Sequence, residues 1–119
     1  MDPWAGLFQR NAIGALVADP QIFTTLYLGS GEGILRSTNG GFTWARLNIL
    51  IPPEALPVRT VAVHPRFSNT IFAGAASQLH RSDDSGVNWR VKFLPTRGKI
   101  KNILIHPLKP EIMFAVLER

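Results

Sequence analysis

Two long stretches of the chain repeat each other, and this internal repeat limits the fold more than any other feature. The stretch LYLGSGEGILRSTNGGFTW (26–44) aligns without a gap with IFAGAASQLHRSDDSGVNW (71–89), at a shift of 45 residues. Upstream, IGALVADP (13–20) aligns with VRTVAVHP (58–65), and IKNILIHP (100–107) is a third copy 42 residues further on. The 119 residues therefore hold two full repeats and about half of a third. Repeats of this length are structural units that stack on their neighbours.

Each copy is a series of short β-strands. Runs such as VAV, ILI and LYLG are rich in β-branched and aromatic residues, they end at Gly or at a residue before Pro, and no helical period occurs. Four strands in a unit of roughly 40 to 45 residues match a β-propeller blade. We therefore predict an all-β chain of four-stranded antiparallel blades, a single propeller fragment over 1–119 with about 2.5 blades. Blade 1 is expected over 11–56, blade 2 over 57–99, and the first half of blade 3 over 100–119.

Both full repeats carry one turn pattern, Ser-x-Asp/Asn-x-Gly-x-x-Trp. Its members are Ser37, Asn39, Gly41 and Trp44 in the first copy, and Ser82, Asp84, Gly86 and Trp89 in the second. The pattern resembles the Asp-box, or BNR repeat, of β-propeller proteins, and the resemblance covers nearly the whole chain. Within that family the chain is more similar to xyloglucanase-type glycosidases and photosystem II assembly factors than to sialidases, because the Arg-Ile-Pro signature of sialidases is missing.

The turn pattern is interpreted as structural. An Asp or Asn side chain can accept hydrogen bonds from backbone N–H groups just ahead of it, and glycine supplies a positive φ. The Ser hydroxyl closes the turn, and the Trp ring covers it. Asn39 stands where the second copy has Asp84, and a general acid or nucleophile could not be replaced in that way. Asp83, outside the pattern, is expected to be a solvated turn residue.

Two histidines recur at the ends of predicted strands and raise the question of a metal site. His64 and His106 match Asp19 of the first copy, each residue stands before a proline, and no second ligand lies close by in the sequence. The residue before proline favours extended backbone and the entry to a turn. We therefore expect a turn at these positions, with no metal and no cofactor.

Function is expected on the rim opposite to the Ser…Trp turns. In a four-stranded blade the first and third connections lie on one rim, and the second connections and the links between blades lie on the other. The polar side chains of that second rim are Ser30, Glu32, Glu54, Gln78, Arg97 and Lys99. Glu32 and Glu54 are its only carboxylates in complete repeats, and glycoside hydrolysis needs two. They are the weak candidates for catalysis.

An open propeller predicts association. Propellers close with about 4 to 8 blades, so 2.5 blades would leave apolar faces and strand edges uncovered. We predict a non-catalytic interaction or scaffold module, assembly-factor-like, completed by a protein partner or by further copies of the chain. The alternative is a piece of a glycan-binding or glycoside-hydrolysing propeller, which makes carbohydrate the alternative ligand.

Composition limits the partners further. The net charge is +5, but the basic residues are spread out, and their densest cluster is Arg97, Lys99 and Lys101 without interleaved aromatic residues, so nucleic acid is not the expected partner. The absence of Cys excludes disulfides and thiolate metal sites. No apolar run suits a signal peptide or a membrane span. We expect a soluble chain whose compartment stays open, although the family it resembles is often extracytoplasmic.

Overall fold

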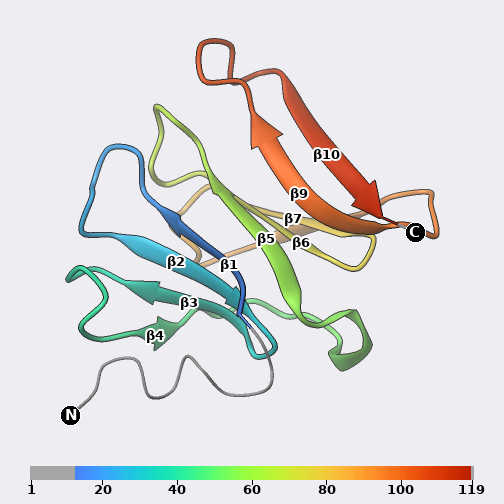
Figure 1. The fold of residues 1–119 in the computed structure, drawn as a ribbon, viewed down its shortest axis with the longest axis horizontal. Helices are drawn as coiled ribbons and strands as arrows, with labels where there is room; N and C mark the ends of the chain where they lie inside the picture. The colour runs from blue at the N-terminus through green and yellow to red at the C-terminus, as the bar shows by residue number, and fades with distance from the viewer. Residues whose placement is uncertain (1–12, 119) are drawn as a thin grey trace.

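The computed structural model describes residues 13–118, and these form three antiparallel sheets (Figure 1). The first sheet contains β1 (Ile13–Ala18), β2 (Leu26–Ser30), β3 (Gly33–Ser37) and β4 (Ala45–Arg46). The second contains β5 (Val58–Val63), β6 (Ile71–Ala75), β7 (Gln78–Ser82) and β8 (Arg90–Phe93). The third pairs β9 (Lys99–Ile105) with β10 (Met113–Glu118), and the 3-10 turn η1 (Pro53–Ala55) precedes β5. The prediction of all-β, four-stranded antiparallel sheets is confirmed.

The three sheets share one register. In each of them the inner strand, which is β1, β5 or β9, carries a β-bulge at the same position of the repeat. The residue left unpaired there is Gly14, Arg59 or Lys101. A bulge redirects side chains and bends the strand. The copies seen in the sequence are thus equivalent residue by residue in the structure, as far as the third sheet extends.

The sheets are stacked so that their inner strands lie side by side, with β5 between β1 and β9 (Figure 1). Two glycines at equivalent positions allow this approach. A Cβ atom built on Gly29 of β2 would lie 2.7 Å from the carbonyl oxygen of Val58, and one on Gly74 of β6 would lie 2.6 Å from Cγ2 of Ile100. Any larger residue at either glycine would push the next inner strand away.

Apolar residues fill the two spaces between the sheets. The cluster between the first and second sheets contains Tyr27, Ile34, Ala55, Val58, Val61, Ile71, Ala73 and Ala75. A smaller cluster between the second and third sheets contains Phe72, Ile100 and Ile103. The only helical segment in the described part, η1, is three residues long, so these residues include no helix that could span a membrane.

The glycine contact leads to a first prediction, for Gly74→Ala. Alanine normally suits a strand better than glycine, but here its methyl group would overlap Ile100 and Thr60, so we expect a loss of about 1–3 kcal/mol in the free energy of unfolding. Val116→Ala is the control, because Val116 has the same register position on the uncovered third sheet and should change stability little. Denaturant unfolding measures both variants, and equal effects would contradict the packing argument.

Candidate functional site: turns, rim cleft and open sheet face

Two turns, residues 37–44 and 82–89, have the same hydrogen bonds. The Ser37 hydroxyl accepts the N–H of Gly41 at 2.9 Å and donates to Oδ1 of Asn39 at 2.9 Å. In the second turn the Ser82 hydroxyl accepts the N–H of Gly86 and donates to Oδ1 of Asp84, both at 2.8 Å. The amide of Asn39 and the carboxylate of Asp84 thus occupy the same place.

The side-chain oxygen of Asn39 or Asp84 also accepts a backbone N–H group from a later residue of its own turn. Oδ1 of Asn39 accepts the N–H of Thr43 at 3.0 Å, and Oδ1 of Asp84 accepts the N–H of Asn88 at 2.8 Å. The side chain of Asn88 also donates to Oδ2 of Asp84 at 2.8 Å. The hydrogen bonds of both side chains are made inside their own turns, so the amide of Asn39 and the carboxylate of Asp84 already have structural partners.

Glycine and tryptophan complete the two turns. Gly41 and Gly86 have φ of +98° and +91°, where a side chain would be strained. The indole N–H groups of Trp44 and Trp89 donate to the carbonyl oxygens of these two glycines, each at 2.9 Å. Trp89 is half-buried and also packs against the core between the first two sheets.

Two acids in the second turn have lowered pKa values for different reasons. The backbone N–H of Asn88, with its side chain and the Ser82 hydroxyl, lowers the pKa of Asp84 to about 2. For Asp83, burial acts to raise the pKa, but the bonds and charge of Arg81, with bonds from Thr70 and Arg90, outweigh it, and the pKa is lowered. Both carboxyls are therefore ionised near neutral pH and are poor proton donors.

Asp83 is an exposed turn residue, as expected, and it also forms two ion pairs that the sequence did not indicate. Although its side chain is partly exposed, Asp83 accepts hydrogen bonds from Arg81 at 3.1 Å and Arg90 at 2.7 Å, and also from Thr70 at 3.2 Å. These contacts are tertiary, because Thr70 just before β6, Arg81 in β7 and Arg90 in β8 meet at the turn. Thr38 takes this position in the first copy, so the repeat itself gave no signal for the ion pairs.

A second prediction concerns the acid sensitivity of the turns. The folded pKa of Asp84 is lowered to about 2 from the ordinary value of 3.8, so its stabilising contribution is complete above about pH 4 and is lost as the pH falls towards 2. Asp84→Asn should therefore keep most of the stability at neutral pH and flatten the stability curve between pH 4 and 2. The measurement is urea unfolding as a function of pH.

Asn39→Asp is the reciprocal control for that prediction. It places a titratable acceptor in the first turn and should add acid sensitivity in the same pH window. Curves for Asp84→Asn and Asn39→Asp that run parallel to the wild type between pH 4 and 2 would contradict the assigned role of the two side chains.

The residues before proline also act as acceptors in turns. Oδ1 of Asp19 accepts the N–H groups of residues 21 and 22, Nδ1 of His64 those of residues 66 and 67, and Nδ1 of His106 those of residues 108 and 109. The carboxylate of Asp19 and the imidazoles of His64 and His106 therefore accept equivalent backbone hydrogen bonds. Within residues 13–118, no group of three or more His, Asp or Glu side chains could hold a metal ion.

These proline turns are joined from one sheet to the next. The side chain of Gln21 donates to the carbonyl oxygen of Arg66 at 2.8 Å, and the guanidinium of Arg66 donates to that of Leu108 at 3.1 Å. The three residues hold equivalent positions in the three copies. Leu108 cannot continue the series because its side chain has no donor.

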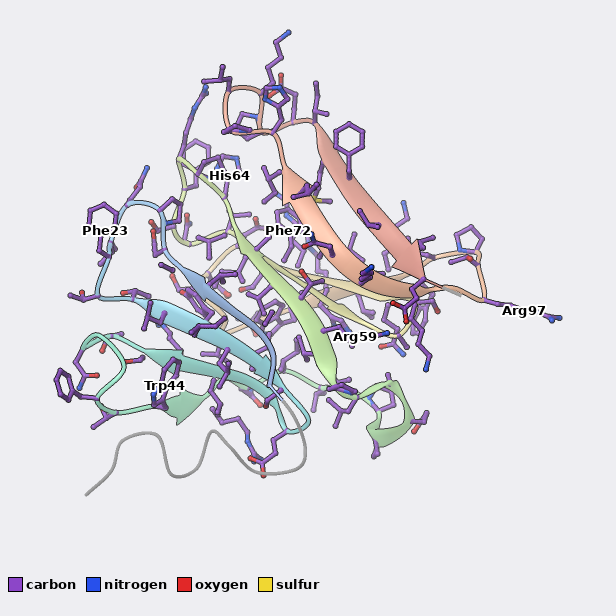
Figure 2. The ribbon with its side chains drawn as sticks, in the orientation of Figure 1. Phe23, Trp44, Arg59, His64, Phe72 and Arg97 are labelled. Carbon is purple, nitrogen blue, oxygen red and sulfur yellow. The ribbon has the colours of Figure 1, made fainter. Side chains whose placement is uncertain are left out.

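A cleft of about 380 Å³ lies on the rim opposite to the turns. Two of the predicted rim residues, Glu54 and Lys99, line it together with Arg59 and Glu118. Arg59 and Glu118 form an ion pair at 3.5 Å. In Figure 2, Arg59 lies toward the end of β5 that is opposite to His64, which places the cleft and the proline turns at opposite ends. The cleft thus combines two cations and two carboxylates.

The other predicted rim residues do not line this cleft. Glu32 is paired with Arg46 at 3.1 Å, where both side chains are exposed. Ser30 closes its own turn by donating to the carbonyl of Gly33 and accepting the N–H of Glu32. Gln78 is within hydrogen-bond distance of the ring of His80, and burial lowers the pKa of that histidine. Arg97 points away from the sheets (Figure 2). Glu54 therefore shares the cleft with the carboxylate of Glu118. Glu32, the carboxylate that the sequence paired with Glu54, does not line this cleft.

Sequence reasoning missed Arg59 and Glu118. Arg59 is the bulged residue of β5, and Gly14 and Lys101 hold the equivalent positions in the other two copies. Because these three residues differ in type, the sequence pattern does not indicate a bulge at this position. Glu118 belongs to the incomplete third copy and was not considered for that reason. The equivalence of Arg59 and Lys101 was the one available signal, because both are basic at a repeated position.

The outer face of the third sheet is apolar and uncovered in the described part of the chain. We call Leu104, Phe114 and Val116 the third-sheet face; they are 53%, 59% and 41% exposed. By register Phe114 is equivalent to Tyr27 and Phe72, which the next sheet covers to 1% and 7% exposure. The repeat thus places an aromatic residue at each interface between sheets, and the third one has no cover among residues 13–118.

Comparison with known proteins supports the fold. No protein-family profile and no curated protein match the chain. Among 23 matching chains of solved structures, an ancestral GH74 enzyme aligns over 88% of this chain with a TM-score of 0.70 and 17% identity. The GH74 enzyme of Niastella koreensis aligns over 90% of this chain with a TM-score of 0.73 and 22% identity. This chain covers only 16% and 19% of those two proteins. Both are β-propeller enzymes, so the likeness shows a propeller-like fold and no more.

Proposed function

We propose that this chain is an Asp-box propeller segment that acts as a non-catalytic association module, assembly-factor-like, through its third-sheet face. The observation that carries the proposal is the exposure of Phe114, whose equivalents Tyr27 and Phe72 are both buried between sheets. The shared bulges and registers support the equivalence of the three positions. A repeat position that lies at an interface between sheets in the first two copies is a candidate interface position in the third copy.

The chemistry of the face favours a protein partner. Burying one large apolar side chain contributes about 1.5–3 kcal/mol, and this face presents three of them close together. Leu108 and Ile112 in the adjoining turn are exposed as well. Contiguous apolar patches on a soluble domain mark interaction sites more often than chance exposure. The partner surface would be another β-sheet, because both interfaces inside the chain are of that kind.

The third prediction tests the face with Phe114→Ser. The wild-type chain should associate with rising concentration, and Phe114→Ser should weaken that association at least tenfold, because the largest ring of the face is lost. Phe93→Ser is the matched control, since Phe93 is also a strand phenylalanine, 66% exposed, but lies on β8 of the second sheet. Sedimentation velocity over a concentration series provides the measurement. A monodisperse wild-type monomer, or equal effects of the two variants, would count against the proposal.

Glycan binding at the rim cleft is the second candidate function. The cleft brings Glu54 and Lys99 together with Arg59 and Glu118, and such groups can bind sugar hydroxyls. Hydrolysis is less well supported, because it needs two carboxylates free to act as acid and as base or nucleophile, and Glu118 is held by Arg59. The resemblance of the sequence to xyloglucanase-type glycosidases makes neutral glucans the first ligands to test.

The fourth prediction concerns that cleft. If glycans bind there, calorimetric titration with glucan oligosaccharides should give a dissociation constant that Glu54→Gln weakens at least tenfold through lost hydrogen bonds. Glu32→Gln should leave the constant unchanged, because Glu32 lies outside the cleft and is paired with Arg46. Absence of binding, or equal loss in both variants, would remove this candidate and leave the association module untouched.

A further inference from the structure

The strand β10 pairs with one neighbour among the described residues, whereas the equivalent strands of the first two sheets pair with two. In the first sheet β2 lies between β1 and β3, and in the second sheet β6 lies between β5 and β7. Within residues 13–118, β10 pairs with β9 alone, so the edge that β2 and β6 use for a third strand is open. Figure 1 shows β10 at the outside of the fold, with no strand drawn beyond it.

This open edge, residues 113–118, is exposed and mostly apolar. β2 and β6 are largely buried, but only Met113 of β10 is partly buried and the other five residues are exposed. The strand reads MFAVLE, with a single charge at its end and neither lysine nor proline. Natural edge strands are usually protected by such residues, and an apolar edge that lacks them pairs readily with another strand.

Phe114 corresponds by register to Tyr27 and Phe72, and both of those rings lie opposite an arginine of the next strand. Tyr27 pairs with Arg36 of β3, and Phe72 pairs with Arg81 of β7. The guanidinium carbon of Arg36 lies 5.8 Å from the centre of the Tyr27 ring, and that of Arg81 lies 5.2 Å from the Phe72 ring. Both distances suit a cation–π interaction. The chain thus places an arginine over this aromatic position in both complete sheets.

The strands that carry these arginines share a pattern. β3 reads GILRS and β7 reads QLHRS, so each has an apolar residue two positions before the arginine and a serine directly after it. The apolar residues, Ile34 and Leu79, pack into the clusters between the sheets. They pair with the glycines of β2 and β6, whose equivalent in β10 is Val116. A strand added to β10 in this register would set its apolar residue beside Val116 and its arginine beside Phe114.

We infer that the open edge of β10 binds an extended strand of a partner protein, antiparallel to β10 and with the pattern apolar-x-Arg-Ser. Backbone hydrogen bonds along the edge would give affinity, and the contacts of the arginine with Phe114 and of the apolar residue with Val116 would give specificity. This inference goes beyond the proposed function, because it concerns the edge of the third sheet and the proposed function concerns its face.

The edge and the face can be occupied together. Inside the chain, Tyr27 contacts Arg36 across the sheet and also packs in the core between the first two sheets. Phe72 likewise contacts Arg81 and packs in the core between the second and third sheets. A ring at this position therefore accepts an arginine from a neighbouring strand and a sheet on its face at the same time. Phe114 can serve both partners in the same way.

A folded second copy does not supply the strand that we infer. Arg-Ser occurs twice in the sequence, in β3 and in β7, and each of these strands already has a partner on both sides. The edge partner is therefore a different protein. Association of copies through the third-sheet face, as proposed above, uses another surface.

The outer edge of the second sheet is a poorer site for the same strand. β8 reads RVKF, and the charges of Arg90 and Lys92 would repel an arginine of an incoming strand. β4 and β8 are also the last strands of the two complete sheets, and no further strand pairs with either of them among residues 13–118. The edge of β10 is the one that the repeat pairs in its other copies.

A peptide with the sequence of residues 77–82, SQLHRS, capped at both ends, tests the inference on the 119-residue chain. An NMR titration of the ¹⁵N-labelled chain locates the site, and fluorescence anisotropy of the labelled peptide gives the dissociation constant. We expect shift changes centred on residues 113–118. Changes centred on β4, on β8 or on the inner strands, or no binding at all, would overturn the inference.

A double-mutant cycle tests the arginine contact. Arg81→Gln in the peptide should weaken binding about two- to fivefold, as expected for a cation–π contact at an exposed site. Phe114→Leu in the chain should weaken the original peptide by a similar factor and leave the variant peptide nearly unchanged. Phe93→Leu is the matched control, because Phe93 is an exposed phenylalanine on β8, and it should change neither constant. Additive losses would contradict the arginine contact.

Two N-methylated peptides test the addition of a strand. In an antiparallel pair, alternate residues of the added strand direct their N–H groups at the neighbouring strand. Methylation at residues 77, 79 and 81 should therefore differ in effect from methylation at residues 78, 80 and 82. One set should weaken binding about tenfold or more through lost hydrogen bonds, and the other should weaken it little. Equal effects of the two sets would show that the peptide does not add as a strand.

The outcomes separate this inference from the proposed function. If the peptide does not bind while Phe114→Ser still weakens association of the chain, the edge inference fails and the proposed function stands. If the peptide binds at β10 while the wild-type chain stays monomeric, the edge inference stands and the proposed function fails. Circular dichroism checks that each variant chain is folded before either reading is made.

Discussion

Gly29 and Gly74 let each inner strand lie directly against the preceding sheet, and the arrangement of the three sheets depends on this approach. With no side chain at these positions, Val58 and Ile100 reach the backbone of the neighbouring sheet. The aromatic rings of Tyr27 and Phe72, two residues before each glycine, are then covered by the same strand. Close packing of this kind gains dispersion contacts that a looser interface would lose. The close packing of the three sheets therefore depends on the missing side chains of Gly29 and Gly74 and on the buried rings of Tyr27 and Phe72.

The connections at one rim are closed by local hydrogen bonds. A side-chain oxygen or ring nitrogen accepts backbone N–H groups ahead of it in the turns that contain Asn39, Asp84, Asp19 and His64. Amide, carboxylate and imidazole are interchangeable in this task, because it requires a lone pair and no particular charge. This rim is thus occupied by structural bonds. The cleft with Glu54 and Arg59 and the open third-sheet face are the two places where we propose that a partner binds.

The cleft and the face differ in what they offer. The cleft collects charged groups, two of which neutralise each other as the pair of Arg59 and Glu118. The third-sheet face offers apolar area in a position that the chain itself uses for contacts between sheets. An exposed ring has no compensating bond in water, whereas an exposed ion pair is already satisfied. This difference is the physical reason to place association before glycan binding.

The sequence by itself determined the repeat, the all-β class and the residues of the two Ser…Trp turns. These depend on local chemistry, since strand propensity, glycine at positive φ and an acceptor side chain act over a few residues. Only the tertiary structure decided that Glu54 lies beside Arg59 and Glu118 while Glu32 pairs with Arg46, and that Asp83 binds two arginines. It also decided that Gly29 and Gly74 face the next strand while Val116 faces an open side. Such contacts join residues from different strands, and their geometry follows from bulges and sheet stacking that no single stretch of sequence specifies.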